Sequence, residues 1–275
     1  MLAEPRRRML LELIATRGFA TLEELVRLLG VSESTVRRDL EALDASGAIK
    51  RTHGGAVTSA EVRAMPALED RMATAATEKR AIGRTAAALV DDGETVLLDG
   101  GTTTFEVARA LLGRPVQVVT NSIPIANLMS SSKQADVILI GGYVSPRTGV
   151  AMGPLAVEMM RGIRVRKAIL GAGGIVAEGV YNSNVLLVET ERQMMECAQE
   201  VVIVADHTKF GRLSLSKLCS LDAIDTVVVD DALPDAFRPL LADAGVTLHV
   251  APGDTNEFEP SQGQSRLNGA VRTEL

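Results

Sequence analysis

The sequence is poor in aromatic residues and in cysteine, and both shortages exclude kinds of site. Aromatic residues make up 3% of the 275 residues and tryptophan is absent, so a site that stacks its ligand against rings is not expected. The two cysteines, Cys197 and Cys219, lie in apolar stretches and cannot form a disulfide framework. We expect buried thiols in a reducing cytoplasm. With only three scattered histidines beside them, neither a metal site nor a cofactor is expected.

Long apolar runs are also missing. No segment approaches the roughly 20 apolar residues that span a bilayer. Residues 1–18 alternate charged and apolar side chains, which is not the pattern of a signal peptide. A hydrophobic fraction of 46% with 23% charged residues is typical of a folded, soluble protein. The sequence therefore predicts a cytoplasmic protein that makes no use of a membrane.

Positive charge is not in excess either. The net charge of −6 argues against a general polyanion binder. Residues 1–57 hold 9 Lys or Arg and 8 Asp or Glu, a balance of +1 that leaves −7 for the remainder. A nucleic-acid surface near the N-terminus would have to place a few cations on one face.

Residues 1–57 carry the pattern of three short helices and a hairpin. Apolar residues recur at helical spacing until Gly18, and Thr21-Leu-Glu-Glu24 has the form of a capping box that opens a second helix. Ser32 can cap a third helix. Residues 48–57 form two extended pieces around a glycine pair. This order predicts a winged helix-turn-helix.

The third predicted helix carries adjacent arginines, Arg37 and Arg38, away from its apolar stripe. Short hydroxyls beside them suit phosphate or base-edge contacts, and arginine can bridge guanine O6 and N7. An isolated arginine pair is more often a solvated helix face, but the surrounding motif favours DNA reading. Asp39 and Glu41 should turn away and pair with Arg38 or Arg8. The candidate DNA-binding residues are Ser32, Ser34, Thr35, Arg37, Arg38, Lys50, Arg51 and His53.

From Glu78 onward, short apolar runs alternate with amphipathic stretches. Continuously apolar strands that alternate with helices indicate a mostly parallel sheet covered on both faces. We predict an α/β domain over residues 78–252, joined by a linker at 58–77 and followed by a disordered tail at 253–275. The seven predicted strands are residues 95–99, 116–120, 136–140, 166–171, 200–206, 225–231 and 246–250.

Residues 97–111 predict a strand, a turn rich in glycine and threonine, and a helix. Backbone amides in such a turn, together with a helix N-terminus, can bind an anion. The segment is neither a P-loop, since no G-K-[ST] follows, nor a dinucleotide fingerprint, since G-x-G-x-x-G is absent. By itself it is equally well explained as a tight connection.

Polar residues and glycines also follow other predicted strands, and ligands of open α/β sheets bind beyond the carboxyl ends of the strands. Lys209 is the natural cation for a phosphate, whereas Asp99, Asn121 and Glu189 could hold hydroxyl groups. Arg147 is as readily an ordinary loop cation. The candidate effector-binding residues are Asp99, Gly100, Gly101, Thr102, Thr103, Thr104, Asn121, Ser122, Gly141, Gly142, Arg147, Gly171, Glu189 and Lys209.

The run TLEELVRLLGVSESTVRRDLEALDASGAIKRTHGGAV resembles the N-terminal domain of the DeoR family of bacterial sugar-metabolism repressors. The later DGGTT, TNS and D-x-T-K-F-G elements resemble its sensor domain, and the likeness extends to about residue 250. The resemblance implies a Rossmann-like sensor domain similar in fold to ribose-5-phosphate isomerase. It also implies operator DNA and a phosphorylated sugar as partners.

The leading hypothesis is a repressor whose binding to operator DNA is controlled by a phosphorylated sugar. Because one winged helix supplies few contacts, we expect a dimer or tetramer. One alternative is a sugar-phosphate isomerase-like enzyme with an accessory DNA-binding domain, for which Asp99, Glu189 and Asp206 are the candidate bases. Another is an oligomerisation module without a ligand. The identity of the sugar, the operator, and whether the effector induces or co-represses stay open.

Overall fold

The computed structural model describes residues 3–17, 19–52, 55–58 and 68–253. Three predictions fall wholly or partly outside these ranges: the DNA contact at His53, residues 59–67 of the predicted linker, and all but the first residue of the predicted tail. None of the helices in the described ranges is both long enough and apolar enough to cross a membrane.

The N-terminal part is built as the sequence predicts, with one additional strand. Strands β1, β3 and β2 form an antiparallel sheet in that order, so the predicted hairpin is extended by a third strand ahead of the second helix. The elements are α1 (Ala3–Arg17), β1 (Phe19–Thr21), α2 (Leu22–Leu29), α3 (Glu33–Ala45), β2 (Ile49–Thr52) and β3 (Gly55–Thr58).

Local capping fixes both helices of the helix-turn-helix. The Thr21 hydroxyl accepts from the Glu24 amide, and the Glu24 carboxylate accepts from the Thr21 amide, so the predicted capping box is present. Gly30 then adopts a left-handed conformation with φ of 62°, which ends α2. Ser32 caps α3 as expected. The turn between the helices is therefore set by local residues.

A buried carboxylate joins α1 to α3. Asp39 is 2% exposed, and its two oxygens accept from the Nε atoms of Arg6 and Arg7. The expectation that Asp39 turns away from the exposed face of α3 is confirmed. The predicted partners, Arg38 or Arg8, are wrong, because Asp39 faces α1 from the inner side of α3.

Asp39→Asn should loosen this junction. An amide of the same shape loses the charge on two charge-assisted hydrogen bonds, which we expect to cost about 1.5–3 kcal/mol. Hydrogen exchange of the full-length chain should then show α3 amides exchanging about 10- to 100-fold faster. Glu12→Gln, an exposed change on α1, is the matched control and should leave α3 protection unchanged. Equal protection in Asp39→Asn and wild type would contradict the role of this contact.

The second part is built on a seven-stranded sheet in the order β15-β14-β12-β9-β4-β5-β6, and every pairing in it is parallel. All seven predicted strands are confirmed. They are β4 (Thr95–Leu98), β5 (Gln117–Thr120), β6 (Asp136–Leu139), β9 (Val165–Gly171), β12 (Ala198–Val204), β14 (Thr226–Asp230) and β15 (Thr247–Ala251).

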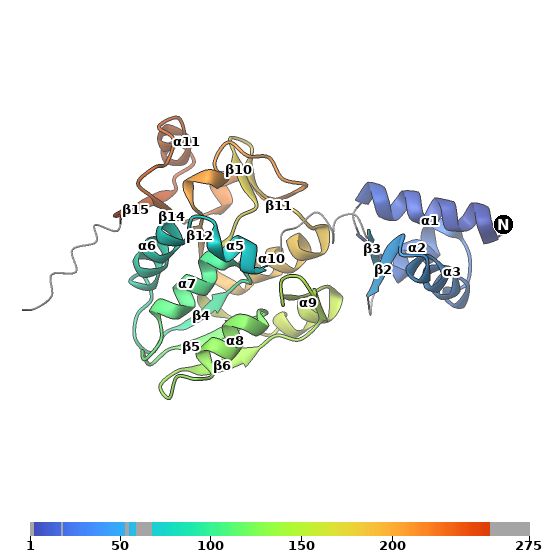
Figure 1. Ribbon diagram of the computed structural model, residues 1–275, viewed down its shortest axis with the longest axis horizontal. Helices are drawn as coiled ribbons and strands as arrows, with labels where there is room; N and C mark the ends of the chain where they lie inside the picture. Colours follow the sequence, from blue (N-terminus) through green and yellow to red (C-terminus); the bar gives the residue numbers. More distant parts are fainter. Residues whose placement is uncertain (1–2, 18, 53–54, 59–67, 254–275) are drawn as a thin grey trace, which may run out of the picture.

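Helices cover both faces of this sheet (Figure 1). Along β4, Val96 and Leu98 enter one core with α6, α7 and α8, whereas Leu97 enters the other with α9, α10 and α11. Burial on both faces explains why the inner strands are largely apolar. The helices are α5 (Leu68–Ala73), α6 (Ala76–Ala87), α7 (Thr102–Ala110), α8 (Ile123–Met129), α9 (Pro154–Met160), α10 (Val185–Cys197) and α11 (Phe237–Asp243).

The chain changes direction across the sheet once. From β4 it proceeds outward to β5 and β6, then returns to the other side of β4 with β9 and proceeds outward to β12, β14 and β15. Strands β4 and β9 are therefore neighbours whose following segments diverge. Such a topological switch point leaves a crevice at the carboxyl edge of the sheet.

Short antiparallel pieces, not predicted from the sequence, are added at that edge. One is a hairpin and the other is a three-stranded sheet in the order β10-β11-β13. They comprise β7 (Tyr143–Val144), β8 (Ala151–Met152), β10 (Gly174–Val176), β11 (Gly179–Asn182) and β13 (Ser216–Cys219), with 3₁₀ turns η1 (His207–Lys209) and η2 (Leu221–Ala223).

Both cysteines are free thiols, and Cys197 is buried as expected. Cys219 lies on β13 and is only partly buried, so the expectation of burial is wrong for that residue.

Candidate functional site

A cavity of about 180 Å³ opens at the switch point. The segment after β4 lines it with Asp99, Gly100 and Gly101, and the end of β9 lines it with Gly171 and Ala172. These two strands pair directly, so residues 70 positions apart in the sequence meet at one edge. The crevice predicted by the topology is therefore a real cavity, and the glycine-rich turn forms part of its wall.

The N-terminus of α7 points its first turn at this cavity. Its N-cap is Gly101, and no side chain caps it. Thr102 and Thr103 line the cavity from the same turn, and both are nearly buried. Uncapped amides and the positive end of the helix dipole favour an anion at this position.

Cationic side chains line the cavity as well. Arg71 reaches it from α5, Lys209 from η1, and Arg212 from the loop that follows. Burial lowers the pKa of Lys209, although the neighbouring carboxylate of Asp206 partly offsets that shift. Cations with amide donors nearby are what a phosphate dianion requires.

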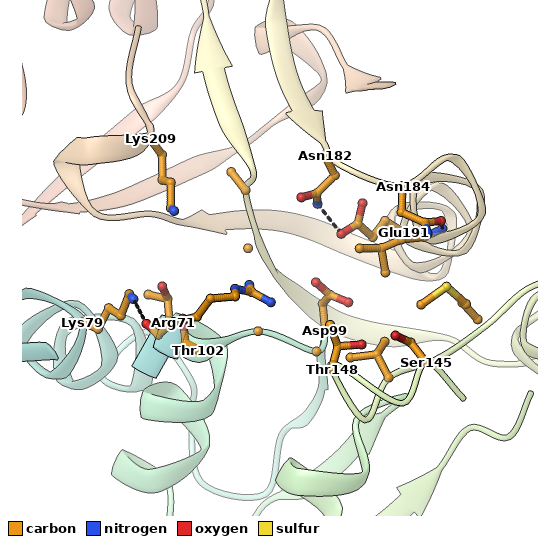
Figure 2. Close-up of a pocket in the computed structure, with 18 of the residues that line it drawn as sticks. Arg71, Lys79, Asp99, Thr102, Ser145, Thr148, Asn182, Asn184, Glu191 and Lys209 are labelled. Atoms are coloured by element: carbon orange, nitrogen blue, oxygen red, sulfur yellow. Dashed lines mark hydrogen bonds between the residues drawn. The ribbon is translucent and has the colours of Figure 1, made fainter. Parts of the chain in front are cut away.

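Lys79 also lines the cavity, but its ammonium group binds backbone carbonyl oxygens. It is buried, and its Nζ donates to the carbonyl oxygens of Arg71 and Thr74 at 2.7 and 2.6 Å. These bonds join the start of α6 to the end of α5, and Figure 2 shows Lys79 turned toward the backbone that carries Arg71. Lys79 therefore positions Arg71.

The opposite wall is acidic (Figure 2). Asp99 and Glu191 are 2% and 0% exposed. Burial raises the pKa of both carboxyl groups, and the charge of Asp99 raises that of Glu191 further. Asn182 on β11 donates from Nδ2 to Glu191 Oε1 at 2.6 Å. The cavity is therefore polar along its length, with cations on one side and carboxyl groups on the other.

Seven of the predicted effector-binding residues line this cavity: Asp99, Gly100, Gly101, Thr102, Thr103, Gly171 and Lys209. The other seven do not: Thr104, Asn121, Ser122, Gly141, Gly142, Arg147 and Glu189. Some of these have local tasks. The hydroxyl of Thr104 donates to the Gly101 carbonyl, Asn121 donates to the Ala151 carbonyl, and Ser122 caps α8. Glu189 is exposed on α10.

Sequence reasoning missed about two thirds of the wall, including Arg71, Lys79, Ser145, Thr148, Asn182, Asn184, Glu191 and Arg212. One signal was available for α10. Asn184, Leu187 and Glu191 are spaced i, i+3 and i+7, which places them on one helix face. That spacing selects Glu191 instead of Glu189, two positions earlier.

The candidate DNA-binding residues described in α3 share one exposed face. Ser32 Oγ lies 2.8 Å from Thr35 Oγ1 and 3.1 Å from Ser34 Oγ at its N-terminus. Arg37 is 51% exposed and donates from Nη2 to Glu33 at 2.6 Å. Exposed ion pairs are worth at most about 1 kcal/mol, so DNA could displace this one at little cost.

Arg38 is exposed on the same helix, and Arg51 of β2 pairs with Glu41 at 2.8 Å. The predicted partners of Glu41 were Arg38 or Arg8, which is wrong. Its actual partner is Arg51, and this ion pair places the cation of the wing beside α3, next to Arg37 and Arg38. Nothing is described of the side chain of Lys50, so that candidate stays a prediction.

The family comparisons match both parts of the chain. The DeoR-like helix-turn-helix domain matches residues 6–62, and the DeoR C-terminal sensor domain matches residues 74–231. The chain belongs to the DeoR family. It is therefore a DNA-binding transcriptional regulator with a sensor domain.

Relatives of similar length support this assignment. The HTH-type transcriptional repressor GlcR of Bacillus subtilis is 33% identical over 92% of this chain and 98% of its own. The glycerol-3-phosphate regulon repressor of Escherichia coli K12 is 33% identical over 88% and 96%. The regulator UlaR of Escherichia coli is 31% identical over 89% and 98%. All three are named as regulators or repressors, so the enzyme alternative is not supported.

Solved structures resemble part of the chain more distantly. Ribose 5-phosphate isomerase A from Neisseria gonorrhoeae is 16% identical with a TM-score of 0.37, covering 50% of this chain and 53% of its own. The eIF2B beta subunit from Chaetomium thermophilum is 15% identical with a TM-score of 0.41, covering 58% and 50%.

Gly100→Ala tests the close packing of the glycine-rich turn. A Cβ at position 100 would lie 2.1 Å from Cγ2 of Val150, a buried side chain that is stiff because it branches at Cβ. We expect a loss of about 1–3 kcal/mol and a melting temperature lower by several degrees in circular dichroism. Gly162→Ala, where a Cβ meets nothing within 4 Å, is the control and should melt like wild type. Equal melting of both variants would show that the turn tolerates a side chain.

Proposed function

We propose that this regulator represses genes of sugar metabolism and that a phosphorylated sugar, bound in the switch-point cavity, controls its affinity for operator DNA. The single observation that carries the proposal is the charge arrangement of the cavity. Arg71, Lys209 and the uncapped α7 suit a phosphate, and Asp99 and Glu191 on the facing wall suit hydroxyl groups. The names of the relatives, which include a glycerol-3-phosphate regulon repressor, are consistent with such an effector.

The control requires a difference in affinity. An effector can release DNA only if it binds the DNA-free arrangement more tightly than the DNA-bound one. A single recognition helix reads few base pairs, so we further propose that the active form is an oligomer that reads paired half-sites. The α3 face with Ser34, Thr35, Arg37 and Arg38 is the proposed reading surface.

Arg37→Ala should weaken operator binding. Loss of one bidentate base contact costs about 1–3 kcal/mol, so a gel-shift titration should show roughly 10- to 100-fold lower affinity and relaxed base preference at one position. The operator fragment would be selected from random DNA by the wild-type protein. Arg161→Ala, at an exposed arginine that directly follows α9, is the control and should bind as wild type. An unchanged footprint for Arg37→Ala would count against α3 as the reading helix.

Lys209→Ala should separate DNA binding from its control. The variant lacks a cavity cation but keeps the α3 face, so operator affinity should stay within about twofold while release by a panel of sugar phosphates is lost. Lys133→Ala, an exposed lysine outside the cavity, should respond as wild type. Release of Lys209→Ala at the wild-type effector concentration would refute the phosphate position. Calorimetric silence of the wild-type protein across the whole panel would favour the oligomerisation module instead.

A further inference from the structure

Two carboxyl groups at the acidic wall are short of hydrogen-bond donors. Asp99 Oδ1 and Glu191 Oε2 are buried, and neither accepts a hydrogen bond from a residue that the structure describes. The nearby hydroxyl of Thr148, 8% exposed, is likewise without a partner in the described ranges. All three side chains line the same cavity. Buried polar atoms in folded proteins nearly always have partners, so this wall is suited to a ligand that brings donors.

Neighbouring groups fix the orientation of both carboxyl groups. Asn182 Nδ2 donates a hydrogen bond to Glu191 Oε1, so Oε2 is the oxygen of Glu191 without a partner among the described residues. The backbone amides of Gly100 and Gly171 donate to the Asp99 carboxylate and counteract part of its burial. Asp99 and Glu191 also interact with each other directly: the charge of Asp99 raises the pKa of Glu191, whereas the contact with Glu191 lowers the pKa of Asp99. Asn182 and these backbone amides therefore hold the wall in one orientation.

This arrangement favours some ligand chemistries over others. A hydroxyl group is uncharged and can donate to either carboxyl oxygen. A carboxylate has no proton to donate and would add a third negative group to a buried pair that already resists holding two charges. Arg71 offsets part of the charge on Asp99, but the proposed phosphate competes for the same guanidinium. Arg192 likewise offsets part of the charge on Glu191, so both cations already act on the carboxyl groups of this wall.

We propose that Asp99 and Glu191 determine effector specificity by accepting ligands whose end remote from the phosphate carries uncharged hydroxyl groups and by rejecting ligands that carry a carboxylate there. This inference rests on the proposed function and narrows it. Among phosphorylated metabolites, it selects sugar and polyol phosphates and excludes phosphorylated sugar acids. Asn182 is a positioning residue in this scheme, because it sets the orientation of Glu191.

The test uses matched pairs of phosphate esters that differ in the terminal group. Glycerol 3-phosphate is compared with 3-phosphoglycerate, and a hexitol 6-phosphate with 6-phosphogluconate, by calorimetric titration of the full-length protein. We expect at least one polyol phosphate to bind 10-fold or more tightly than its acid partner. An acid that binds as tightly as the polyol in both pairs would overturn the proposal.

Glu191→Gln isolates the charge from the shape. A glutamine side chain can still accept from Asn182, but it removes one negative group from the wall, so the preference for the polyol should fall below about threefold. Glu189→Gln makes the same change on the exposed side of α10 and should keep the wild-type preference. Should Glu191→Gln fail to fold by circular dichroism, Asp99→Asn removes the like charge from the other side. A preference that survives in the folded variant would overturn the proposal.

Inorganic phosphate separates this inference from the proposed function. If phosphate protects the wild-type protein against thermal unfolding, and Lys209→Ala loses that protection, the phosphate position is supported. Binding of phosphate without binding of either polyol ester would then overturn the specificity inference alone. If neither phosphate nor any of the four esters binds, both the inference and the proposed function are overturned.

Discussion

The reversal of strand order between β4 and β9 is the constraint on which the sensor domain depends. Two parallel neighbours whose chains leave in opposite directions cannot close the edge between them, and the fold covers that opening with insertions. The β7–β8 loop, the β10–β11 hairpin and η1 all approach the same edge and bring Ser145, Asn182 and Lys209 to the cavity. Polar and charged side chains from distant parts of the sequence meet at this edge because the topology leaves a cavity there.

The sequence predicts those features that depend on neighbouring residues. The inner strands of the parallel sheet are recognisable because burial on both faces makes them largely apolar, and the edge strands β6 and β15 are recognisable by apolar residues although they are only partly buried. The Thr21 capping box is complete within four residues. The acidic wall is different. Asn182 and Glu191 meet through a hairpin too short for a periodic pattern and a helix face chosen by tertiary packing. Arg71 was missed because α5 is a single short helix within a predicted linker.

The two functional surfaces hold their charges in opposite ways. On α3 and the wing, Arg37 and Arg51 are paired with exposed carboxylates, and salt screens such charges strongly. In the cavity, Asp99, Glu191 and Lys79 are buried, so dissolved ions screen them much less. Ionic strength should therefore change the affinity for DNA far more than the affinity for an effector, and the two responses can be measured separately in one protein.

The attachment of Lys79 to α5 has a mechanical consequence. A helix of six residues is too short to be stable alone in water, so α5 keeps its place only through its surroundings, among them the two carbonyl oxygens that the Lys79 ammonium holds. This helix is also the first described element after the wing strand β3, which ends ten positions earlier, and it directly precedes the sensor domain. The buried ammonium group of Lys79 thus stabilises the segment through which the helix-turn-helix domain is joined to the sensor domain.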